Sequence, residues 1–252
     1  MSRIVVFDSG FGSLSIIKPI QKKIKLEIIY FADQKNFPYG TKSVFDLRKI
    51  ILSTINKLEK IFEPDLIVIG SNTPSLLLKD IIKPRIIGVF PPIKKAIDKT
   101  KTNSIAVLVT KSVAESNAFN NYIKNNISDR IKVNVINVSS LVNLVESGKF
   151  IHAKNFSRKK IEKTLLEPIM TNNIDVVTLS STHLPFLLPI LKQIFPNVTF
   201  LDPAYTIANQ VAQKLKKKKS KRRSLKIFTS GNVKLFQKQL LQLGIKNTVK
   251  SL

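Results

Sequence analysis

The chain has 252 residues, and its 42 Lys and Arg against 16 Asp and Glu give a formal net charge of +26. It contains no cysteine, which excludes disulfides, thiolate metal sites, iron–sulfur clusters and a thiol nucleophile. With 43% hydrophobic and 23% charged residues, it has the composition of a globular chain rather than a disordered one.

Short apolar segments alternate with helix-period segments along most of the chain. Several apolar segments lack an alternation of polar and apolar residues, which is typical of strands covered by helices on both faces. The alternation predicts parallel sheets flanked by helices. Pro19 should shorten or kink the first helix. The expected strands are 3–7, 27–32, 65–69, 85–90, 104–109, 132–138, 175–179, 198–201 and 225–229, and the expected helices include 43–61, 113–124, 157–170, 185–194 and 205–219.

An internal repeat divides the chain into two halves. Residues 65–73 (DLIVIGSNT) resemble residues 175–183 (DVVTLSSTH), and both segments then meet a proline and an apolar helix with two adjacent leucines. We therefore expect an α/β fold of two pseudo-symmetric lobes, each a mostly parallel sheet flanked by helices, with the active-site cleft between them. The first lobe is expected at 1–98, completed by 203–252, and the second at 99–202.

Polar residues follow several of the expected strands, where ligands of open α/β sheets bind. Ser71 and Ser181 each fall at a turn from a strand into a helix, whose free N–H groups favour a carboxylate. Short hydroxyls, an amide and backbone N–H groups suit a small anion such as an amino-acid carboxylate. These residue types are also ordinary in turns and N-caps, so both interpretations stay open. The four polar turns are Asp8-Ser9-Gly10, Pro38-Tyr39-Gly40, Ser71-Asn72-Thr73 and Ser181-Thr182-His183.

Three titratable residues each allow a functional and a structural interpretation. Asp8 could orient or deprotonate a neighbour, or accept hydrogen bonds from an ammonium group. His183 is either a general acid/base or a buried histidine with a hydrogen-bond partner. Glu146 ends an apolar helix pattern, and it is either an exposed helix-end residue or part of the cleft.

One segment imitates a dinucleotide-binding fingerprint. Gly10 and Gly12 follow a strand, and Asp33 lies about 20 residues further on, as that fingerprint requires. The third glycine is replaced by Ser15, and Asp8 puts a carboxylate where a pyrophosphate would bind. We therefore do not predict a nucleotide cofactor, and a P-loop is absent from the sequence.

The positive charge has two interpretations, which are polyanion binding and a lysine bias on solvated surfaces. Nine of the 13 residues from Lys214 to Lys226 are basic, but removing all nine still leaves +17. Because the excess is diffuse and no nucleic-acid motif accompanies it, we predict no specific nucleic-acid partner. No apolar run approaches the roughly 20 residues that span a bilayer, and no signal peptide is evident, so we expect a cytoplasmic protein without a membrane partner.

The same segments, in the same order, resemble the glutamate racemases of the aspartate/glutamate racemase superfamily, from Ile4 to about Gly244. The resemblance implies two pseudo-symmetric α/β lobes and a cleft for free glutamate. It implies inversion at Cα without a cofactor or a metal, by two cysteines that act on opposite faces, and we expect a homodimer. The matching stretches are Val6 to Gly10, Phe37 to Ser43, Ser71 to Thr73, Gly88-Val89, Leu144 to Glu146, and Thr182-His183 with Pro185.

The resemblance assigns roles to individual residues. Ser71 and Ser181 stand at the positions of the two cysteines, and Asp8 and His183 match the residues thought to assist the thiols. Ser180 and Leu184 depart from the Gly and Tyr that the family usually shows. The positions expected to bind substrate are Asp8, Ser9, Tyr39, Gly40, Asn72, Thr73, Glu146, Thr182 and His183.

The two serines change the chemistry that the family implies. An alcohol is roughly five or more pKa units less acidic than a thiol, which corresponds to about 7 kcal/mol or more. Two hypotheses follow. The first is a racemase-family enzyme for glutamate or a related acidic amino acid, which is either slow or uses Asp8 and His183 directly as its two acid/base groups. The second is a binding or regulatory protein that keeps the cleft without turnover. A third, weaker hypothesis makes Ser71 or Ser181 a nucleophile or a carboxylate anchor.

Overall fold

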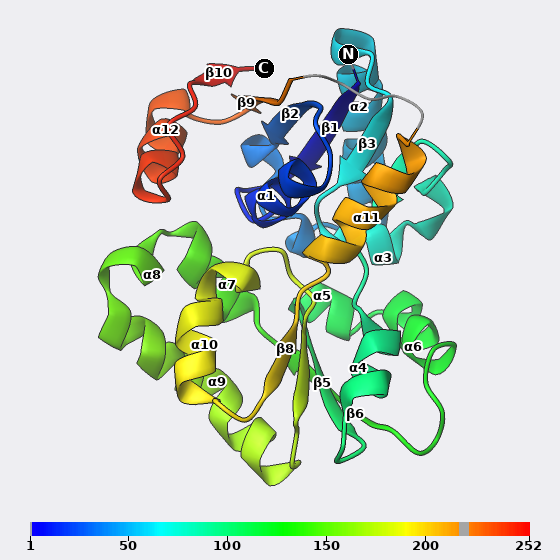
Figure 1. Cartoon of the computed structure of the whole chain (residues 1–252), viewed down its shortest axis with the longest axis vertical. Coiled ribbons are helices and arrows are strands. Elements are labelled where there is room, and N and C mark those ends of the chain that lie inside the picture. Colours follow the sequence, from blue (N-terminus) through cyan, green and yellow to red (C-terminus); the bar gives the residue numbers. More distant parts are fainter. Residues whose placement is uncertain (1, 217–221) are drawn as a thin grey trace. The chain divides into compact units, whose positions relative to one another are not determined.

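The computed structural model describes residues 2–216 and 222–252, which form two compact units (Figure 1). Unit 1 comprises Met1–Val89 and Ala204–Leu252, and unit 2 comprises Phe90–Pro203. The expected boundary at residue 98 is therefore too late. The reason is that α4 (Ile93–Lys99) packs against β7 (Val176–Leu179), a strand of unit 2.

Unit 1 contains a six-stranded parallel sheet in the order β10-β9-β2-β1-β3-β4. Val5 and Phe7 of β1 belong to a core that includes Leu47 and Ile51 of α2. Ile4 and Val6 point to the other face of the sheet and are also fully buried. Helices α1 and α11 pack on each other and lie in front of the sheet in Figure 1. The strands are β1 (Arg3–Asp8), β2 (Glu27–Ala32), β3 (Leu66–Ile69), β4 (Ile86–Gly88), β9 (Ser224–Thr229) and β10 (Val249–Ser251), and the helices are α1 (Leu14–Lys23), α2 (Val44–Phe62), α3 (Asn72–Leu77), α11 (Ala204–Lys214) and α12 (Val233–Gln242), with 3-10 turns η1 (Gln34–Asn36), η2 (Tyr39–Thr41) and η3 (Lys79–Ile81).

Unit 2 contains a four-stranded parallel sheet in the order β6-β5-β7-β8. Ile105 of β5 and Val176 of β7 pack with Ala96 of α4 in one buried cluster. Together the two units confirm the predicted α/β class with mostly parallel sheets flanked by helices. The strands are β5 (Ser104–Val109), β6 (Lys132–Asn137), β7 and β8 (Thr199–Leu201), and the helices besides α4 are α5 (Lys111–Ala114), α6 (Asn117–Lys124), α7 (Ser139–Glu146), α8 (Lys149–His152), α9 (Lys154–Thr171) and α10 (Leu188–Ile194), with the 3-10 turn η4 (Leu184–Leu187).

The internal repeat corresponds to strands β3 and β7, which occupy equivalent places in their sheets. Each lies next to the first strand of its unit, β1 or β5. The repeated aspartates have the same structural role at the start of these strands. Asp65 Oδ2 accepts a hydrogen bond from the Arg3 main-chain N at 2.9 Å, and Asp175 Oδ2 accepts one from Lys101 N at 2.6 Å. Both carboxylates therefore fix the chain where the first strand of the unit begins.

Several expected elements differ from the structure. The expected helix 113–124 is wrong, because Ser116 starts a new helix there by accepting a hydrogen bond from Phe119 N at 3.1 Å. Helix α1 continues to Lys23, beyond Pro19. The expected helix 185–194 begins as the 3-10 turn η4. The segment after residue 203 returns to unit 1, as expected, where β9 pairs with β2, but the short strand β10 was not predicted.

The basic segment from Lys214 to Lys226 lies only partly within the described residues, because residues 217–221 fall outside them. The expected end of a helix at residue 219 falls in the same gap, and α11 ends at Lys214. Within residues 2–216 and 222–252, no helix has the length and apolarity needed to cross a membrane.

Candidate functional site

Each unit has a topological switch point. There, the strands on the two sides of the first strand are reached by connections that run in opposite directions along the sheet. In unit 1 this point lies between β1 and β3, whose carboxyl ends carry Asp8 and Ser71. In unit 2 it lies between β5 and β7, which are followed by Thr110 and Ser181. Ligands of open parallel sheets bind at such points, so the fold places both predicted serines where a ligand is expected.

The turn after β1 is held from beneath by a buried tyrosine. Tyr30 of β2 donates a hydrogen bond from its hydroxyl to Gly10 O at 2.7 Å and accepts one from Ser13 Oγ at 3.3 Å. A side chain at Gly70 would place its Cβ 2.3 Å from Ser13 Cβ, so only glycine lets the turn approach β3 this closely. The glycine segment that imitates a dinucleotide fingerprint therefore packs against the end of β3.

Asp8 and Ser9 are both buried at this turn, with 1% and 4% of their surface exposed. Asp8 Oδ1 accepts a hydrogen bond from Ser9 N at 2.7 Å. Because the main chain holds one carboxylate oxygen, the orientation of the Asp8 side chain is fixed. A buried, oriented carboxylate can accept a proton or bind an ammonium group.

Asn72 is the most informative residue of the turn after β3. It is 5% exposed, and neither its amide nitrogen nor its amide oxygen has a hydrogen-bond partner within the described residues. Leaving such a group buried and unpaired costs about 1–3 kcal/mol per group. The amide can donate to a carboxylate and accept from an ammonium, which are the two charged groups of an amino acid. Ser71, the residue before it, makes no side-chain cap to α3, and the neighbouring Thr73 is 5% exposed.

Tyr39 and Asp33 form a buried pair in unit 1. The Tyr39 hydroxyl donates to Asp33 Oδ2 at 3.0 Å, and Asp33 also accepts from Asn36 and from Ser230 Oγ. Burial, followed by the negative charges of Asp33 and Asp8, raises the pKa of Tyr39 well above its ordinary value. Tyr39 is therefore a neutral hydrogen-bond donor at physiological pH. Gly40 follows it in the short turn η2 and is half-buried.

Sequence reasoning considered Asp33 only as the acid of the dinucleotide fingerprint. The signal that could have identified it is its place directly after β2, the type of position that also gave Asp8 and Ser71.

His183 and Glu146 form a buried pair in unit 2. His183 Nε2 lies 2.8 Å from Glu146 Oε2, and the exposed fractions of the two side chains are 7% and 13%. Glu146 is therefore not an exposed helix-end residue. When the imidazole is neutral, donation from Nε2 leaves Nδ1 unprotonated and able to act as a base. When the imidazole is protonated, Glu146 stabilises its charge.

Ser181 and Thr182 complete the turn after β7. They are 7% and 3% exposed, and Ser181 O accepts a hydrogen bond from Leu184 N at 3.0 Å. The fold thus gathers Ser181, Thr182 and His183 with Glu146 in unit 2. It gathers Asp8, Ser9, Ser71 and Asn72 at adjacent strand ends in unit 1. No group of three or more His, Asp or Glu side chains among the described residues could hold a metal ion.

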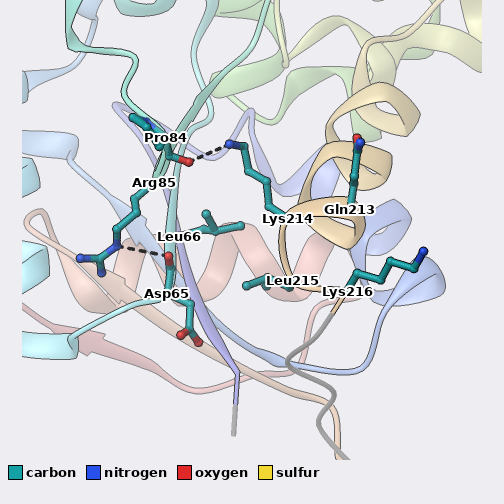
Figure 2. A pocket seen from close by; sticks show the side chains of 8 residues that line it. All are labelled: Asp65, Leu66, Pro84, Arg85, Gln213, Lys214, Leu215 and Lys216. Carbon is teal, nitrogen blue, oxygen red and sulfur yellow. Dashed lines mark hydrogen bonds between the residues drawn. The ribbon is translucent and has the colours of Figure 1, made fainter.

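A pocket of about 880 Å³ lies elsewhere in unit 1 (Figure 2). Its lining includes Asp65 and Arg85, which precede β3 and β4, and it is therefore at the opposite ends of the strands from Asp8 and Ser71. Lys214 Nζ donates to Pro84 O at 2.7 Å, and Arg85 Nε donates to Asp65 O at 3.4 Å. Lys214 therefore joins the end of α11 to the segment before β4, and Arg85 joins the segments before β4 and β3. The lining of the pocket includes none of the predicted site residues.

Comparison with known proteins gives relatives along nearly the whole chain, although no model of a known protein family matches it. The glutamate racemase of Bartonella bacilliformis is 30% identical over 98% of this chain and 96% of its own length. The glutamate racemase of Buchnera aphidicola subsp. Schizaphis graminum is 32% identical over 88% of each chain. Among solved structures, glutamate racemase isoform RacE1 from Bacillus anthracis superposes with a TM-score of 0.86 at 25% identity, covering 100% of this chain and 97% of that one.

Proposed function

Because this chain belongs to the glutamate racemase family, we propose that it binds glutamate and exchanges the proton at its Cα without a cofactor. The observation that carries the proposal is the Asn72 amide beside Ser71 at the switch point of unit 1, which is buried with no hydrogen-bond partner among the described residues. A buried donor and acceptor that the described protein leaves unsatisfied take ordered water or a ligand as their partners. The carboxylate and the ammonium of an α-amino acid supply both partners.

We assign the proton transfers to Asp8 and His183 rather than to the two serines. Deprotonating an alcohol instead of a thiol costs about 7 kcal/mol more, given roughly five pKa units between them. Neither Ser71 nor Ser181 is therefore a competent base at neutral pH. A carboxylate and an imidazole are ordinary acid/base catalysts there.

Each of these two groups is prepared by its own unit. In unit 1, the hydrogen bond from Ser9 N orients the Asp8 carboxylate. In unit 2, Glu146 orients the His183 ring and stabilises the imidazolium that forms when His183 takes a proton. The serines then act as hydrogen-bonding groups toward the substrate. We expect a rate well below that of a two-thiol enzyme.

The test is solvent-deuterium incorporation at Cα of L- and D-glutamate, measured by NMR for the native protein and for Ser71→Cys/Ser181→Cys. We expect slow exchange by the native protein and at least about hundredfold faster exchange by the double variant, because the thiols restore accessible bases. Folded native protein that exchanges no acidic amino acid would overturn the proposal, whether or not the folded double variant exchanges one.

A second candidate function is the binding of glutamate or another dicarboxylate without turnover. The observation that favours it is that both thiol positions carry serine, while the Asn72 amide remains buried without a partner among the described residues. This candidate expects a ligand-dependent rise in Tm of the native protein, since a ligand at 100 times its Kd stabilises by about 2.7 kcal/mol. Stabilisation without exchange in the native protein, with exchange gained in the double variant, would favour binding over catalysis.

A further inference from the structure

One buried hydroxyl in unit 1 joins two segments that are separate in the sequence. Ser75 of α3 has no exposed surface. Its Oγ donates a hydrogen bond to Ser71 O at 2.7 Å and accepts one from Val89 N at 3.0 Å. The hydroxyl carries a single hydrogen, so its donor serves Ser71 and its lone pair serves Val89. Moving either segment alone breaks one of these buried bonds.

Val89 is the last residue of unit 1 before the chain crosses into unit 2. The next residues are held by unit 2 itself. The Phe90 ring stacks on Tyr122 of α6, with ring centres 5.9 Å apart and planes 23° apart, and the Tyr122 hydroxyl donates to Pro91 O at 2.8 Å. Ser75 therefore holds the crossover at Val89 in unit 1, and Tyr122 holds it at Phe90 and Pro91 in unit 2.

We propose that Ser75 is a positioning residue that couples the Ser71–Asn72 turn to this crossover. A ligand that orders the turn at Asn72 also orders the Ser71 carbonyl, and through Ser75 it holds the Val89 amide. The coupling is reciprocal, because a binding free energy that depends on the crossover must act on the crossover in return. The inference rests on the proposed function only in taking glutamate as the ligand of the turn.

The chain offers a matched control for this hydroxyl. Ser157 of α9 is also fully buried and makes the same bond to the carbonyl four residues earlier, Ala153 O, at 2.9 Å. Within the described residues it accepts no second bond, so Ser157→Ala removes a comparable helix contact without touching a crossover. Ser75→Thr keeps the hydroxyl, since a helical threonine can make the same bond to the carbonyl four residues before it.

The experiment compares native protein, Ser75→Ala, Ser75→Thr and Ser157→Ala. The readouts are the Kd for glutamate by calorimetry and the amide hydrogen exchange of peptides that cover 70–73 and 88–91. We expect Ser75→Ala to weaken glutamate binding roughly three- to tenfold and to speed exchange in both peptides. Ser75→Thr should restore most of the affinity, and Ser157→Ala should change neither readout, even if both alanine variants lose similar stability.

Two outcomes would overturn the coupling. The first is unchanged exchange of either peptide in Ser75→Ala. The second is native glutamate affinity in Ser75→Ala despite faster exchange in both peptides. If the native protein binds no glutamate, the proposed function fails, and the exchange of the two peptides alone decides whether Ser75 couples them.

Discussion

The imidazole of His183 and the carboxylate of Glu146 form a buried pair, with Nε2 of His183 2.8 Å from Oε2 of Glu146. The pair joins the end of α7 to the turn after β7, across 37 positions of sequence. It gives unit 2 one oriented acid/base group at the strand end that also carries Ser181. The charge of the carboxylate, and not only its hydrogen bond, is expected to matter, because it stabilises the protonated imidazole.

Glu146→Gln tests this pair, since it keeps the size of the side chain and removes its charge. We expect Cα deuterium exchange to fall about tenfold or more, measured in the native background, in which His183 is the proposed acid/base group. Glu162→Gln is the control, because Glu162 lies in the same unit and pairs with Arg158 at the surface of α9. Equal rates for Glu146→Gln and its parent would show that the carboxylate serves packing alone.

Asn72→Ala separates binding from stability. Because the Asn72 amide has no hydrogen-bond partner among the described residues, its removal should not lower the free energy of unfolding of the ligand-free protein, and relief of the two unpaired groups should raise it. Glutamate affinity should fall at least about tenfold, by calorimetry. The control is Asn134→Ala, because the Asn134 amide donates to Ser104 Oγ at 3.1 Å and to Ile105 O at 3.2 Å. Asn134→Ala should lose stability and keep its affinity for glutamate. If Asn72→Ala instead loses stability and keeps its affinity, the assignment of Asn72 is wrong.

Glu27 makes stability depend on pH. Burial alone would raise its pKa, but the hydrogen bonds from Lys226 and Arg3 outweigh burial and lower the pKa below its ordinary value of 4.5. A carboxyl group with a lowered folded-state pKa contributes stability above its unfolded pKa and loses it as the pH falls through the folded value. Glu27→Gln should therefore cost about 1–3 kcal/mol at pH 7.

The same variant should cost progressively less below pH 4.5, as followed by urea unfolding over a pH series. Glu167→Gln, at an exposed position of α9, is the matched control. A Glu27→Gln deficit that stays constant from pH 7 down to the acid transition would contradict the role of the charged pair.

Gly70→Ala tests the close approach of the turn after β1 to β3. The new Cβ would lie 2.3 Å from Ser13 Cβ, so we expect a loss of about 1–3 kcal/mol in the free energy of unfolding. Ser13→Gly removes the opposing atom, and the double variant Gly70→Ala/Ser13→Gly should recover part of the loss in a double-mutant cycle. If the changes in the free energy of unfolding caused by Gly70→Ala and Ser13→Gly are strictly additive, the two side chains do not clash.

The amino-acid sequence by itself determined the α/β class, most strand positions and the turns that carry polar residues. These follow from local patterns, such as the apolar run at Ile4–Phe7 followed directly by Asp8, and the repeat that places Ser71 and Ser181 after β3 and β7. The missing cysteines are also a property of the sequence alone, and they direct attention to Asp8 and His183. Expectations failed where a single side chain decides a boundary, as Ser116 does between α5 and α6.

Only the tertiary structure decided which polar groups have partners. Asp33 accepts a hydrogen bond from Ser230, 197 positions away, and Ser75 joins Ser71 to Val89. Glu146 pairs with His183, whereas the Asn72 amide has no hydrogen-bond partner among the described residues. Residue type and spacing show that a group can form a hydrogen bond, but they do not show with which group. The hydrogen-bond partners depend on the pairing of β9 with β2 and on the order of the strands in the sheet. Long-range packing determines both.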